Sequence, residues 1–197
     1  MTAQIGDRFQ YKGTSYSVVA MSIPLHFDPK EYGITPESVC TACWAGFWCE
    51  YNITDEGIYL ENLYINSSDG YYPEIAGVLP WSNGKNGKAV EYMGHRLYKG
   101  IHLRMPYSGK ILAGDEFMPQ YYIHMGYQRA WGYKVLKELV FEDGVLLEVN
   151  DQSQVAAEIR EIMNANQEFG AGQCSSIERF VDDSFSLDYG IKAWWLL

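Results

Sequence analysis

Residues 135–149 read VLKELVFEDGVLLEV, and this stretch decides the fold class. Two runs of branched and aromatic residues, 135–141 and 145–149, flank the dipeptide Asp143-Gly144. Asp-Gly is favoured in a two-residue type I′ turn because both central positions of that turn need positive φ. The segment therefore predicts an antiparallel β-hairpin with a well-defined register.

Similar units precede it along the chain. Residues 9–20 turn at Lys12-Gly13, residues 47–60 turn at Asp55–Gly57, and residues 101–113 turn at Ser108-Gly109. In the second unit Glu61-Asn62 breaks the alternation, which predicts a β-bulge before the run continues. We expect a mostly β (α+β) protein whose antiparallel sheet of successive hairpins is curved or sandwich-like.

Residues 151–166 show the periodicity of an amphipathic helix. Its apolar stripe consists of Val155, Ile159, Ile162 and Met163. Asp151 is a candidate N-cap, and Gln154 three residues later would complete a capping box. We expect the stripe to pack against the sheet. No stretch has a linker composition, which predicts a single globular domain spanning residues 1–197.

The chain is acidic, with 25 Asp and Glu against 15 Lys and Arg and a net charge of -10. This balance disfavours nonspecific binding to nucleic acid or to an anionic membrane. The N-terminus lacks the pattern of a secretory signal, and no run is long and apolar enough to span a bilayer. We therefore expect a bacterial-type cytoplasmic protein with reduced thiols.

The cysteines allow three interpretations. Cys40, Cys43 and Cys49 lie close together in the sequence, and Cys174 could complete a four-ligand zinc site. Alternatively, Cys40-Thr41-Ala42-Cys43 could be a redox motif. We favour a third interpretation, in which the cysteines pack in the core as small apolar residues, because there is no second Cys-x-x-Cys. The sequence therefore predicts no metal and no cofactor.

Residues 121–129, YYIHMGYQR, form the stretch that most resembles a ligand site. A histidine there could act as an acid or base, or fix a ligand, because its charge is adjustable near neutral pH. The alternative is a hydrogen-bonded, partly buried histidine. If a pocket exists, we expect His124, Tyr122, Arg129 and Arg104 to converge in it and to bind a carbohydrate or an anionic metabolite.

Charge is unevenly distributed along the chain. Between Ser82 and Gly114 six basic residues, Lys85, Lys88, Arg96, Lys99, Arg104 and Lys110, accompany one acidic residue, Glu91. Either the molecule has a cationic stripe on an anionic body, or this is ordinary surface variation.

The leading functional hypothesis is a non-catalytic protein-binding module, for example a bacterial immunity or inhibitor protein that acts on a basic partner. Tyr and Trp are abundant and make good interface anchors. The predicted contacts are Trp44, Trp48, Tyr71, Tyr72 and Trp81. The second hypothesis is a small-ligand-binding protein or an enzyme, with the pocket around His124. No nucleophile or phosphate-binding motif identifies a catalytic residue, so whether the chain is an enzyme stays open.

Overall fold

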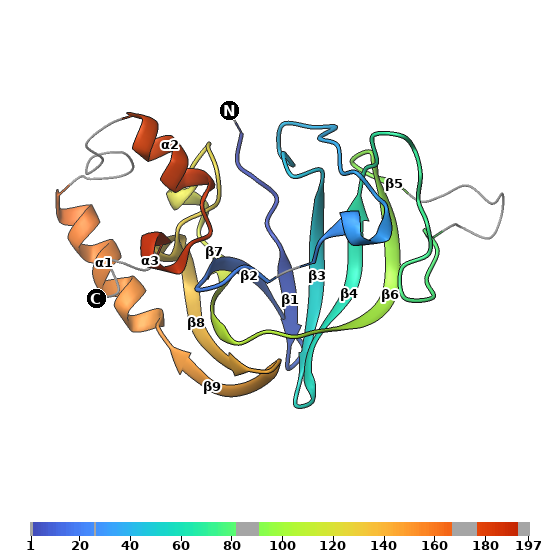
Figure 1. Cartoon of the computed structure of the whole chain (residues 1–197). Helices are drawn as coiled ribbons and strands as arrows, with labels where there is room; N and C mark the ends of the chain where they lie inside the picture. The colour runs from blue at the N-terminus through green and yellow to red at the C-terminus, as the bar shows by residue number, and fades with distance from the viewer. Residues whose placement is uncertain (1, 26, 82–90, 167–176, 193–197) are drawn as a thin grey trace.

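The computed structural model describes residues 2–25, 27–81, 91–166 and 177–192. Within them nine strands form one mixed sheet in the order β5-β6-β4-β3-β1-β2-β7-β8-β9 (Figure 1). The strands are β1 (Arg8–Tyr11), β2 (Thr14–Met21), β3 (Phe47–Thr54), β4 (Gly57–Ile65), β5 (Glu91–Tyr92), β6 (His95–Met105), β7 (Gly109–Phe117), β8 (Tyr133–Glu142) and β9 (Val145–Asp151). The prediction of a mostly β fold is confirmed.

The β-hairpin predicted at residues 135–149 is present. β8 and β9 pair antiparallel around Asp143 and Gly144, whose φ angles are 50° and 82°. Both angles are positive, as a type I′ turn requires. The first unit forms the β1–β2 hairpin and the second forms the β3–β4 hairpin.

The predicted bulge is also confirmed, and it explains how β4 fills the core. Glu50 pairs with Asn62 and Tyr51 pairs with Leu60, so Glu61 has no counterpart on β3. The extra residue shifts the alternation by one, and Leu60 and Leu63 can therefore both be fully buried.

Two features of the sheet differ from the sequence prediction. The third hairpin was wrong, because β6 pairs with β4 whereas β7 pairs with β2. The connection at 106–108 does not reverse the chain: Tyr107 is buried there, and its hydroxyl donates to the Lys110 carbonyl at 2.9 Å. The second difference is that β1 and β3 are parallel, which makes the sheet mixed rather than antiparallel.

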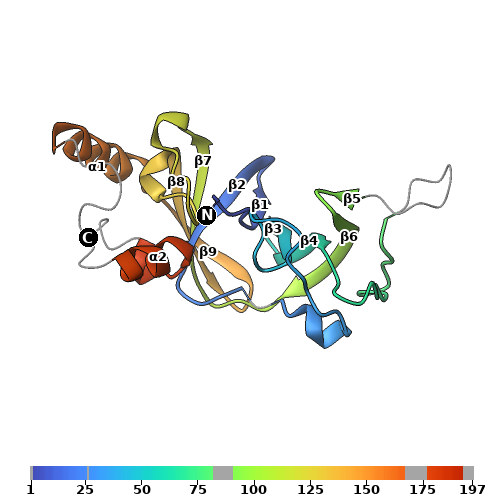
Figure 2. The same cartoon turned by 90° about the horizontal axis from the view of Figure 1, so that it is seen from above.

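The sheet is strongly curled, as the view from above shows (Figure 2). The turn between β8 and β9 approaches the end of β6, where Arg104 donates to the Asp143 carbonyl at 3.1 Å. The inner face holds the larger core, which includes Phe9, Tyr51 and Leu139. A smaller core on the other face of β2, β7 and β8 includes Leu112 and Leu136.

The predicted helix is α1 (Ser153–Asn166), and it lies against β8. Its buried contact is Ala156, whereas Ile162 from the predicted stripe is 60% exposed. Asp151 accepts a hydrogen bond from the Ser153 amide at 2.9 Å. The predicted capping box is not seen in the described part of the chain, where the Gln154 side-chain NH2 group donates to the Glu158 carboxylate.

Two further helices were not predicted: α2 (Ile177–Phe185) and α3 (Tyr189–Lys192). They lie beside α1 at the β7–β8 side of the molecule, while the 3-10 helix η1 (Pro29–Tyr32) lies on the opposite side (Figure 1). The sequence of α2, IERFVDDSF, is poor in strong helix formers. Its long-range contacts favour the helix: the Ser184 carbonyl accepts a hydrogen bond from the Tyr127 amide, and the Phe185 ring stacks on Trp44.

Candidate functional site

Loops gather at the end of the β3–β4–β6 region where β3 begins, β4 ends and β6 begins. Hydrogen bonds hold them in place. The Glu37 amide donates to the Asn66 carbonyl at 3.1 Å, and the Asn66 amide donates to the Gly46 carbonyl at 3.0 Å. Gly46 has a φ of 76° and lies directly on the Glu37 backbone, so a larger residue would separate the two loops.

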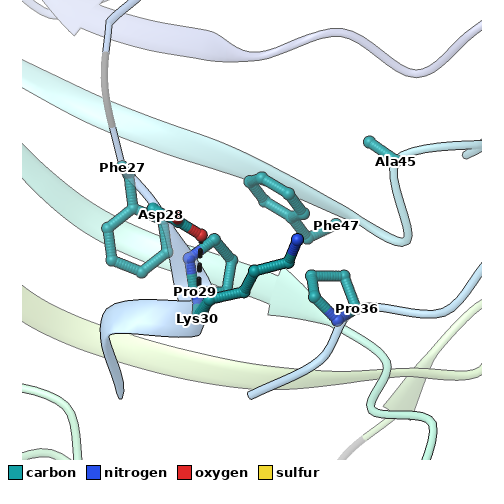
Figure 3. A pocket seen from close by; sticks show the side chains of 7 residues that line it. All are labelled: Phe27, Asp28, Pro29, Lys30, Pro36, Ala45 and Phe47. Carbon is teal, nitrogen blue, oxygen red and sulfur yellow. Dashed lines mark hydrogen bonds between the residues drawn. The ribbon is translucent and has the colours of Figure 1, made fainter. Parts of the chain in front are cut away.

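A hollow of about 350 Å³ opens between these loops (Figure 3). Its lining residues are Phe27, Asp28, Pro29, Lys30, Pro36, Ala45 and Phe47. The rings of Phe27 and Phe47 meet edge to face with centroids 6.4 Å apart. Asp28 caps η1 by accepting a hydrogen bond from the Lys30 amide at 2.9 Å. The Lys30 side chain extends across the hollow toward Phe47 and Pro36 (Figure 3). The lining therefore combines apolar rings with one cation, Lys30, and one carboxylate, Asp28.

Exposed apolar side chains accompany the hollow on the same loops. Trp44, next to the lining residue Ala45, is 49% exposed although it stacks on Phe185 at 4.4 Å. Tyr71 is 56% exposed and lies beside Gly33 at the end of η1. The others are Val39, Leu79, Trp81 and Met93. We call the hollow and these six residues the loop-end surface.

Two of the predicted contact residues are less accessible than expected. The structure does not place Trp48 on the surface: the side chain is only 4% exposed, between Tyr64 and His95. The Tyr72 hydroxyl accepts a hydrogen bond from the Ser67 amide, and Arg96 covers the ring at 5.5 Å. Tyr72 therefore supports the loop rather than projecting from it.

Carboxylates surround the loop-end surface. Exposed acidic residues on its loops are Glu31, Glu37, Asp69 and Glu74. The Asp69 carboxylate accepts hydrogen bonds from the Ser67 hydroxyl and the Tyr71 amide, and these bonds lower its pKa. Asp69 thus holds Tyr71 in position while it stays charged.

The cationic stripe stays a prediction, and the structure places its described members on two strands. Arg96, Lys99 and Arg104 all lie on β6, and Lys99 covers the Trp81 ring at 5.2 Å. Lys110 lies on β7 and pairs with Glu138. Lys85 and Lys88 lie outside the described residues.

The predicted ligand residues do not all converge. Tyr122 and His124 are exposed, with ring centroids 5.0 Å apart, and Arg129 lies five residues further on, immediately before the 3-10 helix η3 (Ala130–Gly132). The Gln128 side chain closes this loop by bonding the Ile123 amide and carbonyl. Arg104, in contrast, reaches the far end of β8, about 30 Å along that strand. The pocket around His124 stays a prediction, and Arg104 is not part of it.

The three described cysteines are free thiols, and Cys43 and Cys49 are buried. Burial raises the pKa of Cys43 to about 11 and that of Cys49 well above its usual value, so neither is a reactive thiolate near neutral pH. Among the described residues no three His, Cys, Asp or Glu side chains are grouped to hold a metal ion. Cys174 lies outside the described residues.

None of the residues that line the hollow was predicted as a site residue, although some local signals for this loop are present in the sequence. Asp28-Pro29 is a typical helix start, with an N-cap followed by proline at the first helical position, and Gly33 is a typical helix end. The meeting of Phe27, Pro36 and Phe47 depends on long-range contacts, which no local pattern predicts.

Comparisons with models of protein families, with curated proteins and with solved structures find no match for the chain. None of the helices in the described residues is long and apolar enough to cross a bilayer.

Proposed function

We propose that the chain is a non-catalytic protein-binding module with a basic partner, as an immunity or inhibitor protein would be. The observation that carries the proposal is the loop-end surface, where the exposed rings of Trp44 and Tyr71 accompany a hollow lined by both apolar and charged side chains. Large exposed aromatic side chains next to a hollow are typical of interface anchors.

The rigidity of these loops supports binding rather than simple exposure. Trp44 is fixed by its stack on Phe185 and by a hydrogen bond from its amide to the Gln4 side chain at 3.1 Å. Tyr71 is fixed through its amide by Asp69. Side chains that are already ordered lose little entropy when a partner binds.

Charge supports a basic partner. The exposed carboxylates on the loops agree in sign with the net charge of -10. A basic protein would be attracted at long range and oriented by the local cations Lys30 and Lys99. Salt should therefore weaken the complex.

The proposal is tested by affinity capture from the source cell with the double variant Trp44→Ala/Tyr71→Ala. We expect the captured basic protein to fall at least about tenfold relative to the wild-type chain, because two anchors of about 1–2 kcal/mol or more are lost. Quantitative mass spectrometry measures the capture, and thermal melts check that the variant is folded.

The matched control is Tyr122→Ala/Ile162→Ala, which removes two side chains of similar exposure outside the loop-end surface. It should retain the partner. Equal capture by both double variants would contradict the proposal, and loss only in the control would favour the segment around His124.

A further inference from the structure

The sheet ends in an unusual edge strand, β9. One edge of β9 pairs with β8, and within the described ranges no strand pairs with its other edge. An edge strand presents backbone N–H and C=O groups that can pair with an added strand. β9 is seven residues long, which is sufficient for such pairing.

The edge of β9 is only partly protected. The strand has a β-bulge and two acidic residues, Glu148 and Asp151, but it contains no lysine, arginine or proline. Val149 pairs with the core residue Leu139 and thus lies on the inner face of the sheet, yet it is 37% exposed. Leu147 is the extra residue of a bulge and is 56% exposed. An added strand would cover both side chains.

The charge on β9 indicates what kind of strand would fit. Glu148 and Asp151 are exposed on the strand, and Glu142 and Asp143 are exposed where it begins. Arg104 and Lys137 lie near the two ends of the strand, and Glu148 is in the middle. A strand that places lysine or arginine opposite Glu148 would therefore gain a cross-strand ion pair.

A second copy of the chain is a poor occupant. Antiparallel two-fold pairing centred on Leu147 would set bulge against bulge and Asp151 against Asp143. Pairing centred on Glu148 would set that carboxylate against its own copy. Each copy also carries a net charge of -10, and like charges directly opposite each other destabilise a sheet.

We propose that β9 binds an extended segment of the basic partner as an additional strand of the sheet. Apolar residues of that segment cover Val149 on the inner face, and alternate basic residues meet Glu148 on the outer face. The inference rests on the proposed function for the basic character of the partner. It adds a second contact surface and a mode of recognition to the loop-end surface.

The test uses the full chain and a capped eight-residue peptide of alternating lysine and valine. NMR titration and amide hydrogen exchange locate the peptide, and calorimetry gives its Kd. We expect chemical-shift changes at β9 amides and slower hydrogen exchange of those amides when the peptide is bound.

Glu148→Lys should raise the Kd of the peptide about tenfold, because a cross-strand attraction becomes a repulsion. Glu158→Lys makes the same charge change on α1 and should leave the Kd within about twofold.

Three outcomes would overturn the inference: no binding of the peptide, equal weakening by both variants, or shifts confined to other strands. A wild-type dimer that Glu148→Lys dissociates would also overturn it in favour of a second copy, and sedimentation detects this. The variant Trp44→Ala/Tyr71→Ala should bind the peptide normally. Failure at β9 is therefore distinguishable from failure of the loop-end surface.

Discussion

Asp7 shows how a single partly buried carboxyl group makes stability depend on pH. Its carboxylate accepts a hydrogen bond from the Cys49 amide at 2.8 Å, beside the buried Cys43 and Cys49 thiols. Desolvation of the carboxyl group raises the pKa of Asp7, and the hydrogen bond from Cys49 lowers it. Desolvation is the larger effect, so the pKa of Asp7 rises to about 6. Burial, together with the negative charge of Asp7, raises the pKa of Tyr127 to about 12.

The raised pKa of Asp7 fixes the sign of a pH effect. The native state holds the proton more tightly than the unfolded state, so Asp7 destabilises the protein as pH rises from about 4 to about 6. A shift from 3.8 to about 6 corresponds to roughly 3 kcal/mol. Asp7→Asn keeps an acceptor for the Cys49 amide and removes the charge. We expect it to be more stable than the wild-type chain above pH 6 and similar to it near pH 4.

Urea unfolding between pH 4 and 8 measures this difference. Asp55→Asn, in the exposed turn between β3 and β4, is the control and should leave the profile nearly unchanged. A constant difference between Asp7→Asn and the wild-type chain across the range would show that Asp7 ionises normally.

At the scale of elements, the sequence predicts those features of secondary structure that residues close together in the chain determine. The turns at Gly13 and Gly144, the bulge at Glu61 and the helix from Ser153 all follow from local patterns. The parallel pairing of β1 with β3 does not, because it joins segments about forty residues apart. The candidate site divides in the same way: exposed Trp44 and Tyr71 were predicted, whereas the hollow beside them was not.

The orientation of α1 also departs from simple amphipathicity. Arg160 belongs to the polar side of the helix, yet its guanidinium donates to the carbonyls of Trp131 and Tyr133 at 3.1 and 2.9 Å. These bonds tie α1 to η3 and the start of β8. The helix is therefore positioned by one long cationic side chain as well as by the buried Ala156.

Replacing this arginine should loosen the helix. Arg160→Met keeps an apolar stem but leaves both carbonyls without the cation. We expect a loss of about 1.5–3 kcal/mol in the free energy of unfolding, as is typical when hydrogen bonds to a charged group are removed. Denaturant unfolding measures it. Glu161→Met, at an exposed position of the same helix, should change stability by less than about 0.5 kcal/mol. Similar losses in both variants would mean that helix propensity, not the Arg160 contact, dominates.

At the scale of the whole molecule, a buried carboxylate joins the last helix to the sheet. Glu138 on β8 is 6% exposed and contacts Lys110 on β7 at 3.4 Å. The Asn150 amide group on β9 also donates to it, and so does the Tyr189 hydroxyl on α3. Burial alone would raise the pKa of Glu138, but these donors and Lys110 outweigh it and lower the pKa.

Tyr189→Phe tests whether this contact holds the C-terminal segment in place. The native state gains stability from ionised Glu138, and that gain is lost as pH falls through its lowered pKa. At pH 7 we expect the variant to lose about 1.5–3 kcal/mol, because a hydrogen bond to a buried charged group disappears. The loss should shrink at low pH, below the lowered pKa of Glu138, because the hydroxyl no longer donates to a charged group there. Exchange of the Met21 amide, which donates to the Leu187 carbonyl, should become faster as the segment detaches.

Tyr122→Phe, at an exposed tyrosine, serves as the control. A loss that is equal at both pH values would place the effect of Tyr189 in packing rather than in its bond to Glu138.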